Sequence, residues 1–330
     1  MDVRRPRVAI LGTRFEDFDV ETEILGDVDL VSGPGSSREH ILSVARGADV
    51  ILAGAAPRFD AGTLDELGAK AIVRLGVGLD GVDLEHARSL GMWVVNVPDY
   101  GTEAVALHAV TLILGSIRRL TTAHDRLRRG VWGVAELRPL RQPSSMTVGI
   151  VGFGRIGQRV GSMLAGVGFA DFLVCDPVTT KDDVVARLSG SRVDLVSLPE
   201  LMARSDVVTL HSPPPGQGHL IGIDELAAMK EGSVLVNTAR GALVDTDALI
   251  RALAENRPGF AALDVFESEP PDAALFEPVI DRVTLTPHMS WYTEESELAL
   301  RRQAAAEARR ILAGEEPLHP VVAPITAQVR

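Results

Sequence analysis

The segment TVGIVGFGRIGQRVGSML (147–164) joins a short apolar run to a glycine-rich turn and then to an amphipathic stretch. Its glycines Gly152, Gly154 and Gly157 have the spacing G-x-G-x-x-G, which in a strand–turn–helix context is typical of dinucleotide binding. The first glycine permits a tight turn and the second lets the backbone approach a pyrophosphate. The third allows the helix to pack closely on the strand. The segment therefore predicts a Rossmann-type α/β unit.

The residues after this turn indicate which dinucleotide would bind. Backbone amides around Arg155 and Ile156, at the start of the predicted helix, would face the pyrophosphate. Asp176 ends the next apolar run, FLVCD (172–176), nineteen residues after Gly157. A carboxylate at that position can accept hydrogen bonds from the ribose hydroxyls and would repel a 2′-phosphate. We therefore predict NAD as the cofactor, with NADP disfavoured.

Apolar runs separated by helix-length segments fill the chain in two series. The first series lies within residues 7–97 and the second within residues 147–288. Strands that are apolar on nearly every residue belong to parallel sheets that are covered on both faces. The sequence therefore predicts two open α/β units. We expect a long helical pattern over 102–128 between them and a helix over 294–313, ending at Gly314.

Length, charge and cysteine content narrow the class of protein. A chain of 330 residues is long for one core, and a net charge of −12 opposes binding to phosphate backbones and anionic lipid. Nucleic acid and membrane are therefore not expected as partners. Cys175 is the one cysteine, so no internal disulfide can form. The apolar stretch from Val105 to Ile117 is too short to cross a bilayer, and no secretory signal is recognised, so we expect a cytoplasmic enzyme.

Three segments carry titratable side chains at the expected carboxyl ends of later strands, where open parallel sheets bind ligands. Arg240 lies in VNTARGALVD, Glu267 and Glu269 follow Asp264 in ALDVFESEPP, and His288 lies in LTPHMSW. These residue types suit hydride transfer to a 2-oxo acid. Arg240 offers a planar cation to the substrate carboxylate and carbonyl oxygen, and His288 can deliver a proton near neutral pH. Glu269 is the candidate for fixing the imidazole tautomer, but spacing alone cannot separate it from Glu267.

At these residues the sequence resembles the D-isomer-specific 2-hydroxyacid dehydrogenase family. The resemblance covers most of the chain, and its segments are RLGVGLDGVDL (74–84), NVPDYGTEAVALHA (96–109), VGFGRIGQ (151–158), LHSPPP (210–215), VNTARGALVD (236–245), ALDVFESEP (262–270) and TPHMSW (286–291). It implies that Arg240, Glu269 and His288 form the catalytic set, and it favours Glu269 over Glu267. It also implies an NAD-dependent reaction between a 2-oxo acid and a D-2-hydroxy acid.

The resemblance further implies binding residues. Those expected to contact the cofactor are Gly152, Gly154, Arg155, Ile156, Gly157, Asp176, Ser212, Pro213, Thr238, Ala239, Arg240, Asp264 and His288. Asp264 would hold the nicotinamide carboxamide. Those expected to contact the substrate are Arg74, Val77, Gly78, Tyr100 and Trp291. No metal site is expected.

The resemblance also implies the domain organisation. A Rossmann NAD-binding domain (101–291) would be inserted in a discontinuous flavodoxin-like substrate domain (1–100 and 292–330), with the active site in the cleft between them. A homodimer joined through the cofactor domains is expected.

Some residues depart from the family pattern or suggest a subgroup. Leu107 replaces the usual acidic residue before His108, and Gly81 replaces a common Asn. Trp291, three residues after His288, resembles the C-terminal-binding-protein-like subgroup, where it would favour a nonpolar or thioether substrate side chain. Trp291 could equally pack as a structural residue.

The subgroup resemblance keeps a second function open, an NAD(H)-responsive scaffold or transcriptional co-regulator. Formate and phosphite dehydrogenases are disfavoured, because their patterns carry Gln at the position of Glu269 and Lys at the position of Val77 respectively.

Overall fold

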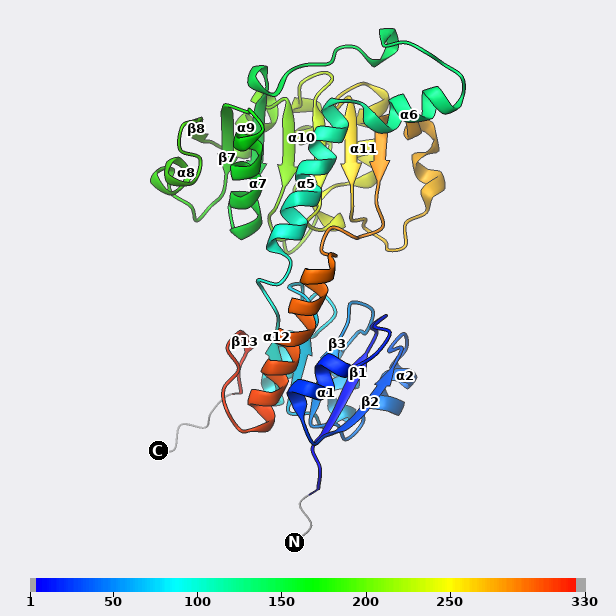
Figure 1. The fold of residues 1–330 in the computed structure, drawn as a ribbon, viewed down its shortest axis with the longest axis vertical. Coiled ribbons are helices and arrows are strands. Elements are labelled where there is room, and N and C mark those ends of the chain that lie inside the picture. The colour runs from blue at the N-terminus through cyan, green and yellow to red at the C-terminus, as the bar shows by residue number, and fades with distance from the viewer. Residues whose placement is uncertain (1–3, 325–330) are drawn as a thin grey trace. The chain divides into compact units, whose positions relative to one another are not determined.

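A computed structural model describes residues 4–324 of the chain. The backbone contacts divide it into two compact units, shown in Figure 1. One unit contains the chain up to Gly101 and again from Thr293, and the other runs from Thr102 to Tyr292. The sequence placed these boundaries one residue earlier, after residues 100 and 291. The ends of the predicted first domain, residues 1–3 and 325–330, lie outside the described residues.

The first unit is a parallel sheet with one added antiparallel strand. Among the described residues its strand order is β13-β5-β4-β3-β1-β2, and β13 runs antiparallel to β5. The order 2-1-3-4-5 of the parallel strands is that of flavodoxin-like folds. Its elements are β1 (Arg7–Leu11), α1 (Asp19–Leu25), β2 (Asp29–Gly33), α2 (Arg38–Ala45), β3 (Val50–Ala53), α3 (Ala61–Leu67), β4 (Ala71–Arg74), α4 (Leu84–Ser89), β5 (Trp93–Val95), α12 (Glu294–Leu312) and β13 (Pro320–Val322).

The returning helix α12 makes this unit discontinuous in sequence. It packs against α1 and over β3 and β4 (Figure 1). Arg301 of α12 is almost fully buried and donates to both carboxylate oxygens of Glu21, at 2.9 and 2.8 Å. The helix therefore contributes a charged contact as well as apolar area to the first unit.

The second unit is a fully parallel sheet. Its strand order is β12-β11-β10-β9-β6-β7-β8. From β6 the chain builds outward to β7 and β8 on one side and then to β9 through β12 on the other, as in Rossmann folds. Its elements are α5 (Thr102–Ile117), α6 (Leu120–Arg128), η1 (Ala135–Leu137), η2 (Pro143–Ser145), β6 (Thr147–Val151), α7 (Arg155–Gly166), β7 (Asp171–Cys175), α8 (Lys181–Arg187), β8 (Arg192–Leu195), α9 (Leu198–Arg204), β9 (Val207–Leu210), α10 (Ile223–Ala228), β10 (Val234–Asn237), η3 (Gly241–Leu243), α11 (Thr246–Ala254), β11 (Phe260–Leu263), η4 (Ala273–Arg282) and β12 (Val283–Leu285).

Helices cover both faces of this second sheet. One hydrophobic cluster joins strand residues to α5, α7 and α8, with Ile113, Val160 and Leu164 fully buried. A second cluster on the other face contains Leu201 of α9 and Leu249 of α11. Burial on both faces explains why the strands are apolar on nearly every residue, as the sequence predicted.

The single helical pattern expected over 102–128 is two helices. Arg119 separates α5 from α6 with a left-handed φ of 51°. Within residues 4–324 no single helix is long and apolar enough to cross a membrane. The bent pair α5–α6 passes on length and composition together, with a 58° bend. However, α5 packs into the core of the second unit through Ala106, Ala109 and Ile113.

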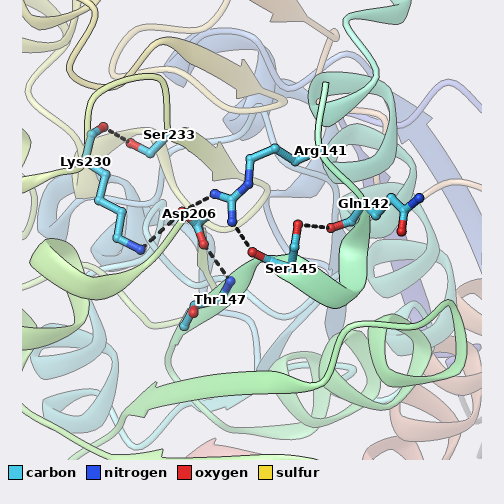
Figure 2. A network of polar contacts seen from close by, with 7 residues as sticks. All are labelled: Arg141, Gln142, Ser145, Thr147, Asp206, Lys230 and Ser233. Carbon is cyan, nitrogen blue, oxygen red and sulfur yellow. Dashed lines mark hydrogen bonds and ion pairs between the residues drawn. The ribbon is translucent and has the colours of Figure 1, made fainter. Parts of the chain in front are cut away.

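A polar network ties the amino ends of three strands in the second unit to the segment before β6. Figure 2 shows Asp206, which directly precedes β9, between three donors. It accepts hydrogen bonds from the Thr147 amide at 2.8 Å, from Arg141 at 2.8 Å and from Lys230 at 3.1 Å. Burial opposes ionisation of Asp206, but these donors outweigh it, so the pKa of the carboxyl lies below its usual range.

We expect Asp206→Asn to lower the free energy of unfolding by about 1–2 kcal/mol at pH 7, because a largely buried carboxylate loses its charge beside two cations. Since the folded pKa is depressed, this stabilisation is present above the ordinary aspartate pKa of about 3.9 and is lost as the pH falls below it. Urea unfolding at several pH values measures the difference between the two proteins. Asp194→Asn, at an exposed pair, is the control. An equal effect of the two substitutions would contradict the role given to Asp206.

Candidate active site

The glycine turn after β6 lies at the point where the strand order reverses. Gly152 has a φ of 88°, and a Cβ added to it would lie 2.7 Å from backbone atoms of His211 and Ser212, which follow β9. A Cβ on Gly157 would lie 2.2 Å from the Gly152 carbonyl oxygen. A Cβ on Gly154 would meet no heavy atom within 4 Å. The first and third glycines are therefore required by the fold itself, whereas the second faces open space at the start of α7.

Asp176 ties this turn to the end of β7. Its carboxylate accepts hydrogen bonds from the backbone amides of Phe153 at 2.7 Å, Val178 at 2.8 Å and Thr179 at 2.9 Å. Burial opposes ionisation of Asp176, but these amides outweigh it and place the pKa of the carboxyl below its usual range. A negative charge is thus held beside the glycine turn.

Three buried polar atoms at the same edge of the sheet have no partner within the described residues. They are His211 Nδ1, Ser212 Oγ and Thr238 Oγ1. Burial lowers the pKa of His211 to about 3, so this imidazole is neutral. Buried polar groups normally have partners, and orphaned ones at a ligand edge fit a polar ligand. Together with the glycine turn and Asp176, these residues fit a dinucleotide such as NAD. Pro213 is exposed beside Ser212, and Ala239 is half-buried.

His288 and Glu269 form a close pair at the carboxyl ends of β11 and β12. His288 Nδ1 lies 2.7 Å from Glu269 Oε2, and the two side chains are 39% and 37% exposed. Glu267 lies elsewhere, with its Oε1 at 2.6 Å from His219 Nε2. The geometry therefore brings Glu269 to the imidazole, and it leaves Nε2 of His288 as the ring nitrogen not used by Glu269.

Asp264 holds the segment that carries His288. It is fully buried, and its carboxylate accepts from the Thr286 hydroxyl at 2.6 Å and from the amides of Met289 at 3.0 Å and Ser290 at 2.9 Å. His288 itself has a left-handed φ of 50°. These contacts fix an uncommon backbone conformation at the imidazole. The expected contact of Asp264 with a nicotinamide carboxamide stays a prediction.

Arg240 follows β10 in a turn that is built by a buried Asn237. The Asn237 side chain accepts from the Ala239 amide at 3.0 Å and donates to the Arg240 carbonyl at 2.8 Å. The Arg240 side chain is half-buried and donates to the Ala239 carbonyl at 2.7 Å. Because all strands of this unit are parallel, Arg240, Glu269, His288 and the glycine turn share one edge of the sheet.

The expected substrate residues fall in both units. Arg74 ends β4, and the loop after it contains Val77 and Gly78. Val77 is 46% exposed, and its carbonyl accepts a hydrogen bond from the Asn96 side chain at 2.8 Å. Tyr100 follows β5 in the same unit. Trp291 belongs to the second unit, where its ring packs edge-on against Tyr292 with centroids 5.5 Å apart.

Sequence reasoning missed the supporting residues of this site. Asn237 builds the Arg240 turn, and Thr286 connects Asp264 to His108, whose Nε2 lies 3.2 Å from the Thr286 hydroxyl. A polar residue at the end of an otherwise apolar strand, as in VLVN (234–237), is the signal that could have indicated Asn237. In the part of the chain that the structure describes, no cluster of three or more His, Cys, Asp or Glu side chains could hold a metal ion.

The doubly wound parallel sheet, the glycine turn at its switch point and the acidic residue after the second strand define a dinucleotide-binding protein of the Rossmann class. The family model described as D-isomer specific 2-hydroxyacid dehydrogenase, NAD binding domain, matches residues 110–290. The chain therefore belongs to this family, which confirms the family resemblance of the sequence. Membership of the C-terminal-binding-protein-like subgroup stays a prediction.

Comparison with individual proteins agrees with this assignment. The chain is 34% identical over 313 residues to a D-3-phosphoglycerate dehydrogenase of Methanocaldococcus jannaschii, covering 94% of this chain and 58% of that protein. It is 37% identical over 297 residues to a D-3-phosphoglycerate dehydrogenase of Mycobacterium tuberculosis, covering 88% and 54% respectively. The chain thus spans little more than half the length of these relatives.

A solved structure covers both units. The crystal structure of D-lactate dehydrogenase from Aquifex aeolicus, complexed with NAD and lactic acid, matches with a TM-score of 0.84 and 28% identity over 96% of this chain and 99% of that chain. This match confirms the predicted fold class, with a Rossmann cofactor domain and a substrate domain.

Proposed function

We propose that the chain is an NAD-dependent oxidoreductase that interconverts a 2-oxo acid and a D-2-hydroxy acid. The observation that carries this proposal is the His288–Glu269 pair, which shares one sheet edge with the glycine turn and Arg240. A proton donor, a cation for a carboxylate and a dinucleotide turn are the groups that this reaction needs. The structures and names of the family relatives support the same activity.

Each group has a defined task in the reduction. The bound cofactor supplies the hydride. Arg240 binds the substrate carboxylate and polarises the carbonyl oxygen, on which negative charge develops. His288 donates a proton from Nε2 to that oxygen. Glu269, bonded to Nδ1, fixes the tautomer and balances the charge of the imidazolium. In the reverse direction His288 accepts the proton of the hydroxyl.

NAD is proposed over NADP because of Asp176. Its carboxylate is held ionised by three backbone amides next to the glycine turn, where the ribose of a bound dinucleotide would lie. A 2′-phosphate would meet this charge, whereas ribose hydroxyls could donate to it. The other proposed contacts are those of the α7 amides with the pyrophosphate and those of Ser212 and Thr238 with polar parts of the cofactor.

The proposed substrate residues are Arg74, Val77, Gly78, Tyr100 and Trp291. D-3-phosphoglycerate and lactic acid, which the relatives' names give, differ in size and charge. The rings of Trp291 and Tyr292 offer an apolar surface close in sequence to His288 and would suit a nonpolar substrate side chain.

Turnover with a panel of acids tests the proposal. NADH or NADPH consumption is followed with glyoxylate, hydroxypyruvate, pyruvate, phenylpyruvate and 4-methylthio-2-oxobutyrate, and NAD reduction with D-lactate and D-3-phosphoglycerate. We expect turnover with NADH and at least one acid, and a lower kcat/KM with NADPH. The alternative NAD(H)-responsive scaffold predicts tight NADH binding without turnover of any acid, so that outcome would overturn the enzyme proposal.

A homodimer is also proposed, joined through the second unit. Large apolar side chains are exposed on α6 and the segment after it: Leu120 (64%), Leu127 (57%), Val131 (42%), Trp132 (88%) and Val134 (56%). Several exposed apolar side chains within one short segment fit a surface that another protein chain covers. Light scattering of the purified protein and of Trp132→Glu measures the mass: we expect a dimer and a monomer respectively, and a monomeric unsubstituted protein would exclude the dimer.

The absence of nucleic acid and membrane partners and the cytoplasmic location stay predictions.

A further inference from the structure

A second His–Glu pair lies two residues from Glu269. His219 Nε2 is 2.6 Å from Glu267 Oε1, and the two side chains are 33% and 37% exposed. His219 comes from the segment after β9, and Glu267 from the segment after β11. The pair therefore joins the loops that follow two different strands at the edge of the sheet where the candidate site lies.

The other oxygen of Glu267 reaches a third element. Its Oε2 accepts from the backbone amide of Thr246 at 2.9 Å, and Thr246 is the first residue of α11. Burial opposes ionisation of Glu267, but the hydrogen bonds from Thr246 and His219 outweigh it and place the pKa of the carboxyl below its usual range. A charged carboxylate thus holds three loops at one point.

The Arg240 turn, taken as residues 237–243, lies between the loop that carries Glu267 and the loop that carries His219, and it contacts both. A Cβ added to Gly241 would lie 1.9 Å from the Phe266 carbonyl carbon and 2.4 Å from the Glu267 amide nitrogen, so the two backbones are in direct contact. On the other side, the amides of Leu220 and Ile221 donate to the Leu243 carbonyl at 3.0 and 2.8 Å. The position of Arg240 is therefore set by the two segments that the pair connects.

The same backbone also positions the catalytic carboxylate. The Phe266 amide donates to Glu269 Oε1 at 3.1 Å, while Glu269 Oε2 bonds His288. A shift of the 266–267 backbone would consequently displace Gly241, which is next to Arg240, and Glu269. The distance between Arg240 and the His288–Glu269 pair would then change.

We propose that His219 and Glu267 are positioning residues for the proposed reaction. They hold the Arg240 turn against the backbone that orients Glu269, and so fix the spacing between the carboxylate-binding cation and the proton-donating imidazole. This inference rests on the proposed function. It assigns to Glu267 a role different from that of Glu269, although the two lie in the same short loop.

The effect on catalysis should exceed the effect on stability. A half-exposed contact between an imidazole and a carboxylate contributes little to the free energy of unfolding, because water competes for both groups. Displacing a catalytic group by about 1 Å can cost about 100-fold in rate. A residue that only stabilises the fold would lower the melting temperature and leave kcat/KM of the remaining folded protein unchanged.

The test compares Glu267→Ala, Glu267→Gln, His219→Ala and His219→Gln with the unsubstituted protein. We expect Glu267→Ala and His219→Ala to lower kcat/KM for the 2-oxo acid by about 10- to 100-fold, with the dissociation constant of NADH unchanged. Both Gln variants should recover most of the activity. In Glu267→Gln the side-chain oxygen can still accept from the Thr246 amide, and in His219→Gln the side-chain NH₂ can still donate to Glu267. The double variant Glu267→Ala/His219→Ala should lose no more than either single variant.

A matched control comes from the first unit. His86 forms a similar pair with Asp65, 2.8 Å apart, and His86→Ala should change neither kcat/KM nor NADH affinity. Hydrogen exchange of the 240–246 segment provides a readout that does not depend on turnover, and Glu267→Ala should accelerate it while His86→Ala does not.

The outcomes separate the two proposals. An unsubstituted protein without turnover refutes the proposed function, and exchange then decides whether the pair holds the Arg240 turn. An active protein whose Glu267→Ala variant keeps its kcat/KM, or an unchanged exchange rate at 240–246, overturns the positioning role.

Discussion

Replacement of His288 by Gln is expected to lower kcat for reduction of a 2-oxo acid by about 10²- to 10⁴-fold. Gln has about the size of His and can still bond Glu269, but it cannot supply a proton to the developing alkoxide. The segment around residue 288 should keep its conformation, because Asp264 holds it through the amides of Met289 and Ser290. Stopped-flow or steady-state NADH consumption measures the loss.

The binding of NADH separates this effect from unfolding. The glycine turn and Asp176 are built by β6, β7 and α7, whereas His288 follows β12 at the far edge of the same sheet. The dissociation constant of NADH should therefore stay within about twofold of that of the unsubstituted protein. Glu269→Gln should fall between the two proteins in kcat, since the imidazole keeps a hydrogen-bond partner but loses the charge that balances it. Turnover by His288→Gln above a tenth of the normal kcat would show that another group delivers the proton.

The apolar patterns predicted the architecture because both sheets are buried on both faces. The strands β6, β9, β10 and β11 are covered on each side, so nearly every residue had to be apolar. The sheet edges gave no such signal. In β8, at one edge, none of the four residues is buried, and Arg192 and Asp194 are exposed charged groups. At the edge of the other sheet, β13 is a strand of only three residues that pairs antiparallel with β5. The break at Arg119 was also missed, because a left-handed φ at an arginine has no sequence signature.

The candidate site was predictable to the extent that sterics fix the residue type. Gly152 and Gly157 must be glycines because backbone atoms fill the space of a Cβ. The roles of the carboxylates could not be derived in this way. Asp264, Glu267 and Glu269 lie within six residues of each other. Asp264 supports the His288 segment, Glu267 bonds His219 and Glu269 bonds His288, and only the directions of the side chains separate these roles. Spacing along a loop does not encode those directions, so the resemblance had to choose between the two glutamates.

The largest expected effect on cofactor binding comes from the glycine turn, where two substitutions of the same kind should fail for different reasons. Gly157→Ala places a Cβ 2.2 Å from the Gly152 carbonyl oxygen, a backbone atom that cannot move aside without opening the turn. We expect it to lower the free energy of unfolding by about 1–3 kcal/mol and to weaken NADH binding at least tenfold. Gly154→Ala meets no heavy atom within 4 Å, so the fold should tolerate it. Its methyl group would occupy the space through which the backbone approaches the pyrophosphate, so NADH binding alone should weaken, by about tenfold or more.

Gly166→Ala, in the last turn of the same helix α7, is the matched control, because its Cβ also meets nothing within 4 Å and lies far along the helix from the turn. Urea unfolding and NADH fluorescence titration on the three variants should give three patterns: both properties lowered for Gly157→Ala, affinity alone lowered for Gly154→Ala, and neither lowered for Gly166→Ala. If Gly154→Ala keeps full NADH affinity, the pyrophosphate does not lie at this turn. The cofactor site would then have to lie away from the start of α7, and the proposed placement of the nicotinamide beside His288 and Arg240 would lose its support.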